Sequence, residues 1–100
     1  MTTTFKVKTD FDIGPSGTPQ TQITGATLGT LVQSVYICNV GATQTYANVI
    51  VASDTSIAYK VAIPGNSTLT LDKVFILNSG DVLSMDGTSC QAVTSYLEIT

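Results

Sequence analysis

Apolar and polar residues alternate along much of the chain after residue 30. The clearest case is the segment 57–63, in which every second residue is a large apolar one until the sequence Pro-Gly-Asn-Ser of 64–67 interrupts it. Side chains of a β-strand point alternately to its two faces, so this alternation predicts a half-buried strand. The residues that follow, 68–71, alternate again. Pro, Gly, Asn and Ser between two such segments predict a hairpin or a corner between two sheets.

Turn sequences recur every 8 to 12 residues over the last seventy, and no segment between them has a helical period. We expect strands at 31–40, 45–52, 57–63, 68–77, 81–85 and 91–100. The dipeptide Asp86-Gly87 favours a tight hairpin turn, because both residue types tolerate positive φ. With weaker N-terminal strands included, the pattern predicts an all-β fold: a single antiparallel β-sandwich, jelly-roll-like, of about seven or eight strands.

The last expected strand has two different faces. Val93, Leu97 and Ile99 lie on one of them, and Thr94, Tyr96 and Glu98 lie on the other.

The first 30 residues differ from the rest. A short strand is expected near 5–8 and a weak one within 20–30, but 10–19 holds two of the three prolines and several other strand breakers. We therefore expect an extended N-terminal arm over 1–30 and a sandwich domain over 31–100. An arm of this kind gains affinity when it orders against a neighbouring subunit. Its candidate contact residues are Phe5, Phe11, Ile13, Pro15 and Pro19.

Composition narrows the classes of function. Apolar residues make up 43% of the chain and charged residues 11%, which excludes a disordered charged tail. With so few charges, the 17 Thr and 9 Ser are expected to cover the outer faces of the sheets. The net charge of −3 and the lack of Arg argue against nucleic-acid binding. No apolar stretch approaches the roughly 20 residues that span a bilayer, and the start lacks the basic and apolar parts of a signal peptide, so we expect synthesis in a cytoplasm.

Candidate chemistry is sparse. The chain has no His, and general acid–base catalysis most often uses His or paired carboxylates. We therefore expect no enzyme, and no catalytic, cofactor-binding or metal-binding residues. The close pair Asp10 and Asp12 has two interpretations: a calcium site, which needs several oxygen ligands, or a solvated loop that caps its own backbone.

The four tyrosines also allow two interpretations. Aromatic faces stack on sugars, which would suit a carbohydrate site, whereas core or interface positions use the apolar ring and the polar hydroxyl together. They are Tyr36, Tyr46, Tyr59 and Tyr96.

Cys38 and Cys90 are the only cysteines, and each lies in or beside an expected strand. One interpretation is a pair of unpaired thiols packed as small apolar groups. The other is a disulfide that clamps an early strand to the last one, which would stabilise the fold by about 3 to 4 kcal/mol. Cytoplasmic synthesis disfavours the bond, although a particle that later meets an oxidising exterior can form it.

Several segments resemble small virion structural proteins of tailed bacteriophages. The similarity covers about two-thirds of the chain, from 35 to 100, and rests on the residues 35–40, 63–73, 77–83 and 96–100, which read VYICNV, IPGNSTLTLDK, LNSGDVL and YLEIT. The resemblance implies a β-sandwich module on the phage particle, assembled in the host cytoplasm.

We expect the function to follow that resemblance. The first hypothesis is a capsid decoration, or cement, protein that forms a homo-oligomer, with a trimer favoured, and binds major capsid proteins. The second is a neck, tail or baseplate adaptor or fibre-attachment protein. The third is a carbohydrate-binding adhesive module. None of these partners is nucleic acid or membrane.

Overall fold

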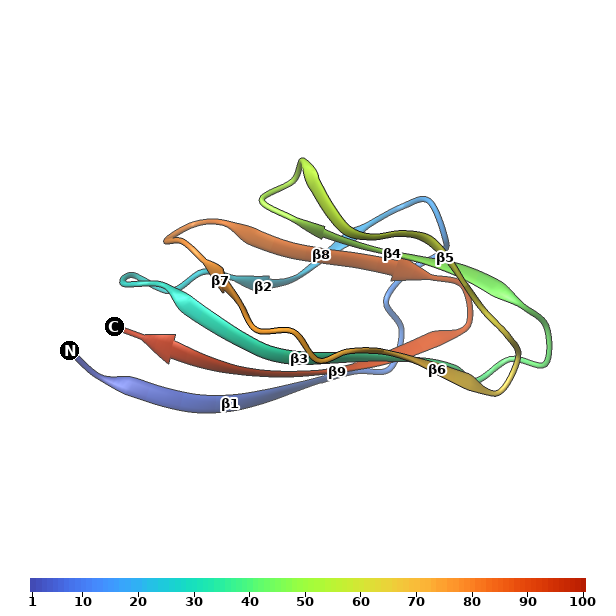
Figure 1. Ribbon diagram of the computed structural model, residues 1–100, viewed down its shortest axis with the longest axis horizontal. Helices are drawn as coiled ribbons and strands as arrows, with labels where there is room; N and C mark the ends of the chain where they lie inside the picture. Colours follow the sequence, from blue (N-terminus) through green and yellow to red (C-terminus); the bar gives the residue numbers. More distant parts are fainter.

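Nine β-strands and no helix make up the computed structural model, which describes residues 1–100 (Figure 1). No helix is therefore present that would be long and apolar enough to cross a membrane. The strands are β1 (Thr3–Asp10), β2 (Gln20–Thr24), β3 (Thr30–Asn39), β4 (Thr45–Val51), β5 (Thr55–Ile63), β6 (Ser67–Leu71), β7 (Phe75–Leu77), β8 (Val82–Gly87) and β9 (Cys90–Ile99).

The strands form two antiparallel sheets that face each other in Figure 1. Sheet A has the order β1-β9-β3-β6, and β7 pairs with β3 farther along the same edge as β6. Sheet B has the order β2-β8-β4-β5. The expected all-β class and antiparallel pairing are confirmed, and the fold is that of a β-sandwich.

Most connections pass from one sheet to the other. Of the expected tight turns, only the one between β4 and β5 joins two neighbouring strands as a hairpin. The sequence 64–66 is the corner from sheet B to sheet A. The expectation of a hairpin turn at Asp86-Gly87 is wrong, because both residues end β8 and the chain crosses to sheet A through Thr88 and Ser89. Ser89 takes the positive φ, 60°, that this crossing requires.

One apolar core lies between the two sheets, and both sheets contribute to it. Its buried members are Ile13, Ile23, Val32, Val35, Ile37, Ala47, Val49, Ala58, Ile63, Leu77, Leu83, Met85, Cys90, Ala92 and Tyr96. Burial of side chains such as these provides the main driving force for folding.

Residues 1–30 form part of this core and of both sheets, and do not extend from the sandwich as an arm. β1 pairs with β9 in continuous register from Thr3 opposite Ile99 to Asp10 opposite Ala92. β2 pairs with β8, and Ile13 and Ile23 belong to the core. The edge of β9 offers unpaired backbone groups, and β1 satisfies them with its own, which is why a segment with few apolar residues is still ordered.

Candidate interaction surfaces

The five residues expected to contact a partner lie in three different environments. Phe5 is 59% exposed on β1, and Phe11 is 87% exposed just beyond the end of that strand. Pro15 and Pro19 are exposed in the connection from β1 to β2. Ile13 is fully buried, because this connection folds over the end of the two sheets and places Ile13 in the core. Ile13 is therefore a core residue, and its expected role as a contact residue is wrong.

The outer face of sheet A carries a row of apolar side chains that crosses four strands. Strand register places Phe5 opposite Leu97, Leu97 opposite Leu31, and Leu31 opposite Ile76. Phe5 and Ile76 are 59% and 64% exposed at the two ends of the row, and Leu31 and Leu97 are half-buried between them. We call Phe5, Leu97, Leu31 and Ile76 the apolar row.

Strand β1 turns its more apolar face to the outside, and the neighbouring β9 has apolar residues on both faces. On β9, Thr94 is fully buried and Tyr96 is 9% exposed, whereas Val93 on the other face is 38% exposed. On β1, Phe5 and Val7 face outward together with Leu97 and Ser95, to which they are paired. Antiparallel sheets that face water usually show the reverse pattern, with apolar residues inside.

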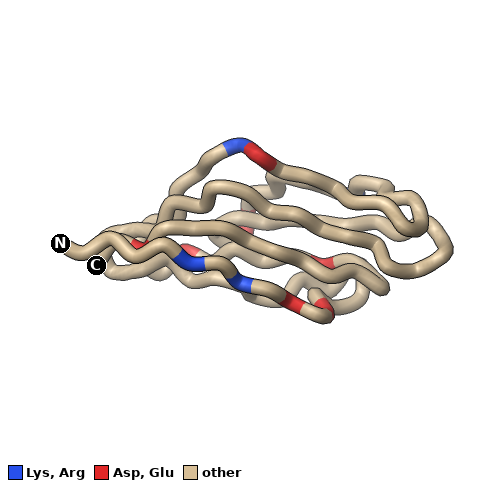
Figure 2. Tube along the Cα trace, turned by 90° about the horizontal axis from the view of Figure 1, so that it is seen from below, with Lys and Arg blue, Asp and Glu red and all other residues tan.

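No charged side chain belongs to the outward positions of sheet A. The charged residues of β1 and β9 alternate with the outward ones and lie on the inner side: Lys6, Lys8, Asp10 and Glu98. Figure 2, which views the molecule from the side of sheet A, shows charged positions along the edge strand and at the periphery, while the middle strands are almost free of them.

The inward charges close the open side of the sandwich between β1 and β2. Lys6 Nζ lies 2.7 Å from Glu98 Oε1, and Lys8 Nζ contacts Asp10 Oδ1 and lies 3.4 Å from Gln22 Oε1 of β2. The hydrogen bond and the charge of Glu98 raise the pKa of Lys6 above its ordinary value of 10.5. Inward-pointing charges on an edge strand also discourage pairing with a further strand.

Asp10 and Asp12 do not act as a pair. Asp10 contacts Lys8, whereas Asp12 Oδ1 accepts a hydrogen bond from the backbone N–H of Gly14 at 2.9 Å. No group of three or more His, Cys, Asp and Glu side chains gathers where it would hold a metal ion. The geometry thus matches the loop-capping interpretation of Asp12.

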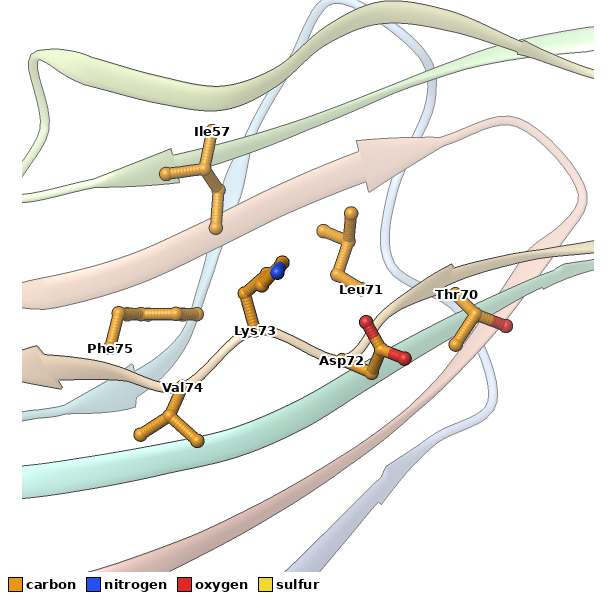
Figure 3. Close-up of a pocket in the computed structure, with 7 residues that line it drawn as sticks. All are labelled: Ile57, Thr70, Leu71, Asp72, Lys73, Val74 and Phe75. Carbon is orange, nitrogen blue, oxygen red and sulfur yellow. The ribbon is translucent and has the colours of Figure 1, made fainter.

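The opposite open side of the sandwich is an apolar groove of about 350 Å³ (Figure 3). Ile57 of β5 faces Leu71 and Phe75 across it, and the stem of Lys73 rises between them, whereas Val74 points away. The groove thus lies between the edge of sheet B and the segment that joins β6 to β7.

A second hollow, of about 360 Å³, lies on sheet B under the connection between β1 and β2. It is lined by Ser16, Gly17, Tyr46, Asn48 and Lys60. Tyr46 is 51% exposed, and Tyr59, whose ring centroid is 5.3 Å from Lys60 Nζ, is 67% exposed. Of the other tyrosines, Tyr36 is exposed on sheet A and Tyr96 is buried, so only Tyr46 lines a hollow.

A third hollow, of about 300 Å³, marks the end of the sandwich at which Phe11 lies. Phe11, Val40 and Gln91 line it together with Asp12, Ser89 and Cys90. Val40 is 52% exposed, so two apolar side chains project at this end of the molecule.

The two cysteines lie on neighbouring strands but on opposite faces of sheet A. Cys38 is opposite Gln91, and Cys90 is opposite Asn39, so each cysteine pairs with the residue next to the other cysteine. Directly opposed residues share a face, and therefore Cys90 points to the core while Cys38 points outward. Both thiols are free, which matches the first of the two interpretations, and the alternative disulfide is not formed, because the Cβ vectors point apart. Burial, together with the nearby Cys38 and Asp86, raises the pKa of the Cys90 thiol.

Comparison with known proteins finds no relative of this chain. No family model, no curated protein and no solved structure matches the chain. The surfaces described above are therefore the structural features that bear on function. Of these, the apolar row and the groove depend on strand register and on contacts between sheets, and single-sequence reasoning did not find them.

Proposed function

We propose that the chain is a non-enzymatic structural protein of a bacteriophage virion that decorates the capsid, and that it binds major capsid proteins through the end of the sandwich at Phe11. The observation that carries the proposal is the 87% exposure of the Phe11 side chain, beside the 52% exposed Val40. Aromatic residues, Phe included, are enriched at the cores of protein–protein interfaces, where a few buried anchors carry most of the binding energy.

The arrangement of the strands supports the same proposal. Consecutive strands mostly lie in different sheets, as in jelly-roll sandwiches, which include viral capsid proteins. We include a jelly-roll-like topology in the proposal. The resemblance of 35–100 to small phage virion proteins supports a location on a particle.

Quantitative mass spectrometry of purified virions, combined with electron cryomicroscopy, tests the location. A copy number comparable to that of the major capsid protein, with density over the capsid lattice, is the expected result. Density confined to the neck, tail or baseplate, with few copies per particle, would show the adaptor function instead. A virion without the protein would refute both.

Rebinding tests the role of Phe11. Particles from a phage that lacks the gene are mixed with purified wild-type protein, with Phe11→Ala or with Leu28→Ala. Leu28 is a matched control, because it is 59% exposed and its backbone N–H binds Ile99, at the end of β9 remote from the Phe11 end. We expect Phe11→Ala alone to lose binding by about tenfold or more, the effect of removing an aromatic anchor. Equal binding of the two variants would refute the assignment of this end.

The hollow on sheet B favours a second candidate function, the binding of a carbohydrate. An exposed aromatic ring and a lysine side chain, from Tyr46 and Lys60, line one hollow, and such groups stack on and hydrogen-bond to sugars. A glycan array tests this function. Binding that is lost in Tyr46→Ala and kept in Tyr36→Ala, a tyrosine on the other sheet, would support it, and an array without any bound glycan would exclude it.

A further inference from the structure

We propose that the outer face of sheet A is a self-association interface, on which a second copy of this chain packs face to face with its apolar row on the apolar row of the first. The inference goes beyond decoration of a capsid, because it concerns a different surface and a partner that is the same chain. It is tested in solution without any phage particle, so its failure is distinguishable from failure of the proposed function.

The orientation of β1 and β9 is the first argument. Strand β1 points its only apolar face away from the core, and β9 carries large apolar residues on its outer face as well as its inner one; Phe5 and Val7 on β1 and Val93 on β9 are between 38% and 59% exposed. A strand that is half-buried in a monomer gains stability from the reverse orientation. Apolar side chains on the outer face of sheet A become favourable when a second layer of protein covers that face.

The distribution of charge also supports the proposal and indicates that the partner is a second copy of the chain. Each copy carries a net charge of −3, so two copies repel each other wherever acidic groups meet. The outward positions of sheet A are uncharged, and the lysines and acids of β1 and β9 are paired on the inner side, as Lys6 is with Glu98. An uncharged apolar face is complementary to a copy of itself, as a two-fold symmetric interface requires.

The geometry of the row suits such an interface. In a face-to-face pair the two-fold axis lies in the plane between the sheets. If the axis runs along the strands, Phe5 of one copy meets Ile76 of the other, and if it runs across them, each residue of the row meets its own copy. Either arrangement covers all four side chains, and inner faces of stacked sheets pack in this manner at about 10 Å.

The face is large enough for a stable pair. Four strands at a spacing of about 4.8 Å, and the ten residues of β9 at about 3.3 Å each, give a projected area of roughly 600 Å². The accessible area exceeds the projected one because side chains stand out from the sheet. It therefore approaches the roughly 800 Å² per partner of a standard protein–protein interface.

Sedimentation velocity and light scattering of the purified chain, over a range of concentrations, provide the test. We expect a species of twice the 10.4 kDa chain mass. Phe5→Lys and Ile76→Lys place a charge in the row and should raise the dissociation constant by at least about tenfold, because burial of an unpaired charge is costly. Tyr59→Lys is the matched control, a 67% exposed aromatic on sheet B, and should associate like the wild type.

Circular dichroism and thermal unfolding establish that each variant is folded. If a lysine variant is not, Phe5→Ser and Ile76→Ser remove apolar area without adding charge and should also weaken the pair. A wild-type chain that stays a single copy at all concentrations would overturn the proposal. So would a trimer, as the resemblance led us to expect, or row variants that associate as strongly as the Tyr59→Lys control.

Discussion

The side-chain amide of Asn48 donates a hydrogen bond of 2.9 Å to the carboxylate of Asp86, which lies directly opposite it on the neighbouring strand of sheet B. Asp86 is fully buried, although it lies on the side of the sheet away from the core. The connection between β1 and β2 forms hydrogen bonds near this pair. The backbone N–H of Gly87 donates to Gly14 O, and Ser16 Oγ donates to Tyr46 O. A connection expected to reach a neighbouring subunit instead covers a polar pair of its own chain.

Asn48→Ala should destabilise the fold by about 3 kcal/mol, because it removes a partner of a buried carboxylate. It also removes the acceptor of the Lys60 backbone N–H, which lies 2.8 Å from Asn48 Oδ1. Urea denaturation measures the free energy of unfolding. Asn78→Ala, at an exposed turn, is the control and should change it little. Equal stabilities of the two variants would contradict the role assigned to the pair.

The ion pair of Lys6 and Glu98 should make stability fall at high pH. The folded-state pKa of Lys6 is raised above 10.5, so the stabilisation is complete below that value and is lost as pH rises through the raised pKa. Between about pH 9 and about pH 12, the thermal midpoint of Glu98→Gln should fall less steeply than that of the wild type. Asp54→Asn, at an exposed turn, is the control and should keep the wild-type slope. Parallel curves for all three proteins would show that the pair has no such effect.

At concentrations where the chain is a single copy, iodoacetamide should modify Cys38 well before Cys90. The thiolate is the form that reacts. Cys90 is only 1% exposed, and its raised pKa leaves less of it as thiolate, whereas Cys38 points outward. Mass spectrometry of peptides after timed alkylation measures the order. In Cys38→Ser, only the slow reaction should remain. A reducing agent should leave the thermal midpoint of the wild type unchanged, and a lowered midpoint would reveal a disulfide.

Gly25→Ala should destabilise the end of the sandwich that is remote from Phe11. A Cβ at Gly25 would lie 2.0 Å from the carbonyl oxygen of Asn78, so the backbone of one of the two loops must shift. Gly25 also donates to Asp81 O and accepts from Gly80 N, and a shift disturbs both bonds. We expect a loss of about 2 to 3 kcal/mol in urea denaturation.

Gly17→Ala is the comparison for this change. A Cβ there meets no atom, and only the positive φ of 92° is unfavourable, which costs about 1 kcal/mol. A larger loss for Gly17→Ala than for Gly25→Ala would contradict the steric explanation.

Individual residues show which parts of the fold could be predicted from the local sequence pattern. The alternation over 57–63 predicted β5, and the turn residues at 64–67 predicted its end but left a hairpin and a corner between sheets as alternatives, of which the structure has the corner. Asp86-Gly87 has the composition of a hairpin turn, yet it continues β8. A Cβ on Gly87 would lie 2.9 Å from Cys90 Sγ, so close packing accounts for this glycine. The sequence of a dipeptide shows which backbone conformations it favours. It does not show how the dipeptide packs, because the packing depends on residues distant in sequence.

The sequence alone determined that the chain is all-β and where most strands lie, because these properties follow from a period of two along the chain. The faces did not always follow: a bulge in β5 buries Ala58 with Ile63, while Ile57 and Tyr59 of the expected apolar face are 41% and 67% exposed. Tertiary structure alone decided which face of a strand is inside. On β9 the buried face is that of Thr94 and Tyr96, and on β1 it is the face of the lysines. Register between strands also decided that Cys38 and Cys90 lie back to back and that Phe5, Leu97, Leu31 and Ile76 form one row. Such relations depend on hydrogen bonds between strands whose paired residues are as much as 96 positions apart, as Thr3 and Ile99 are, and no local pattern contains them.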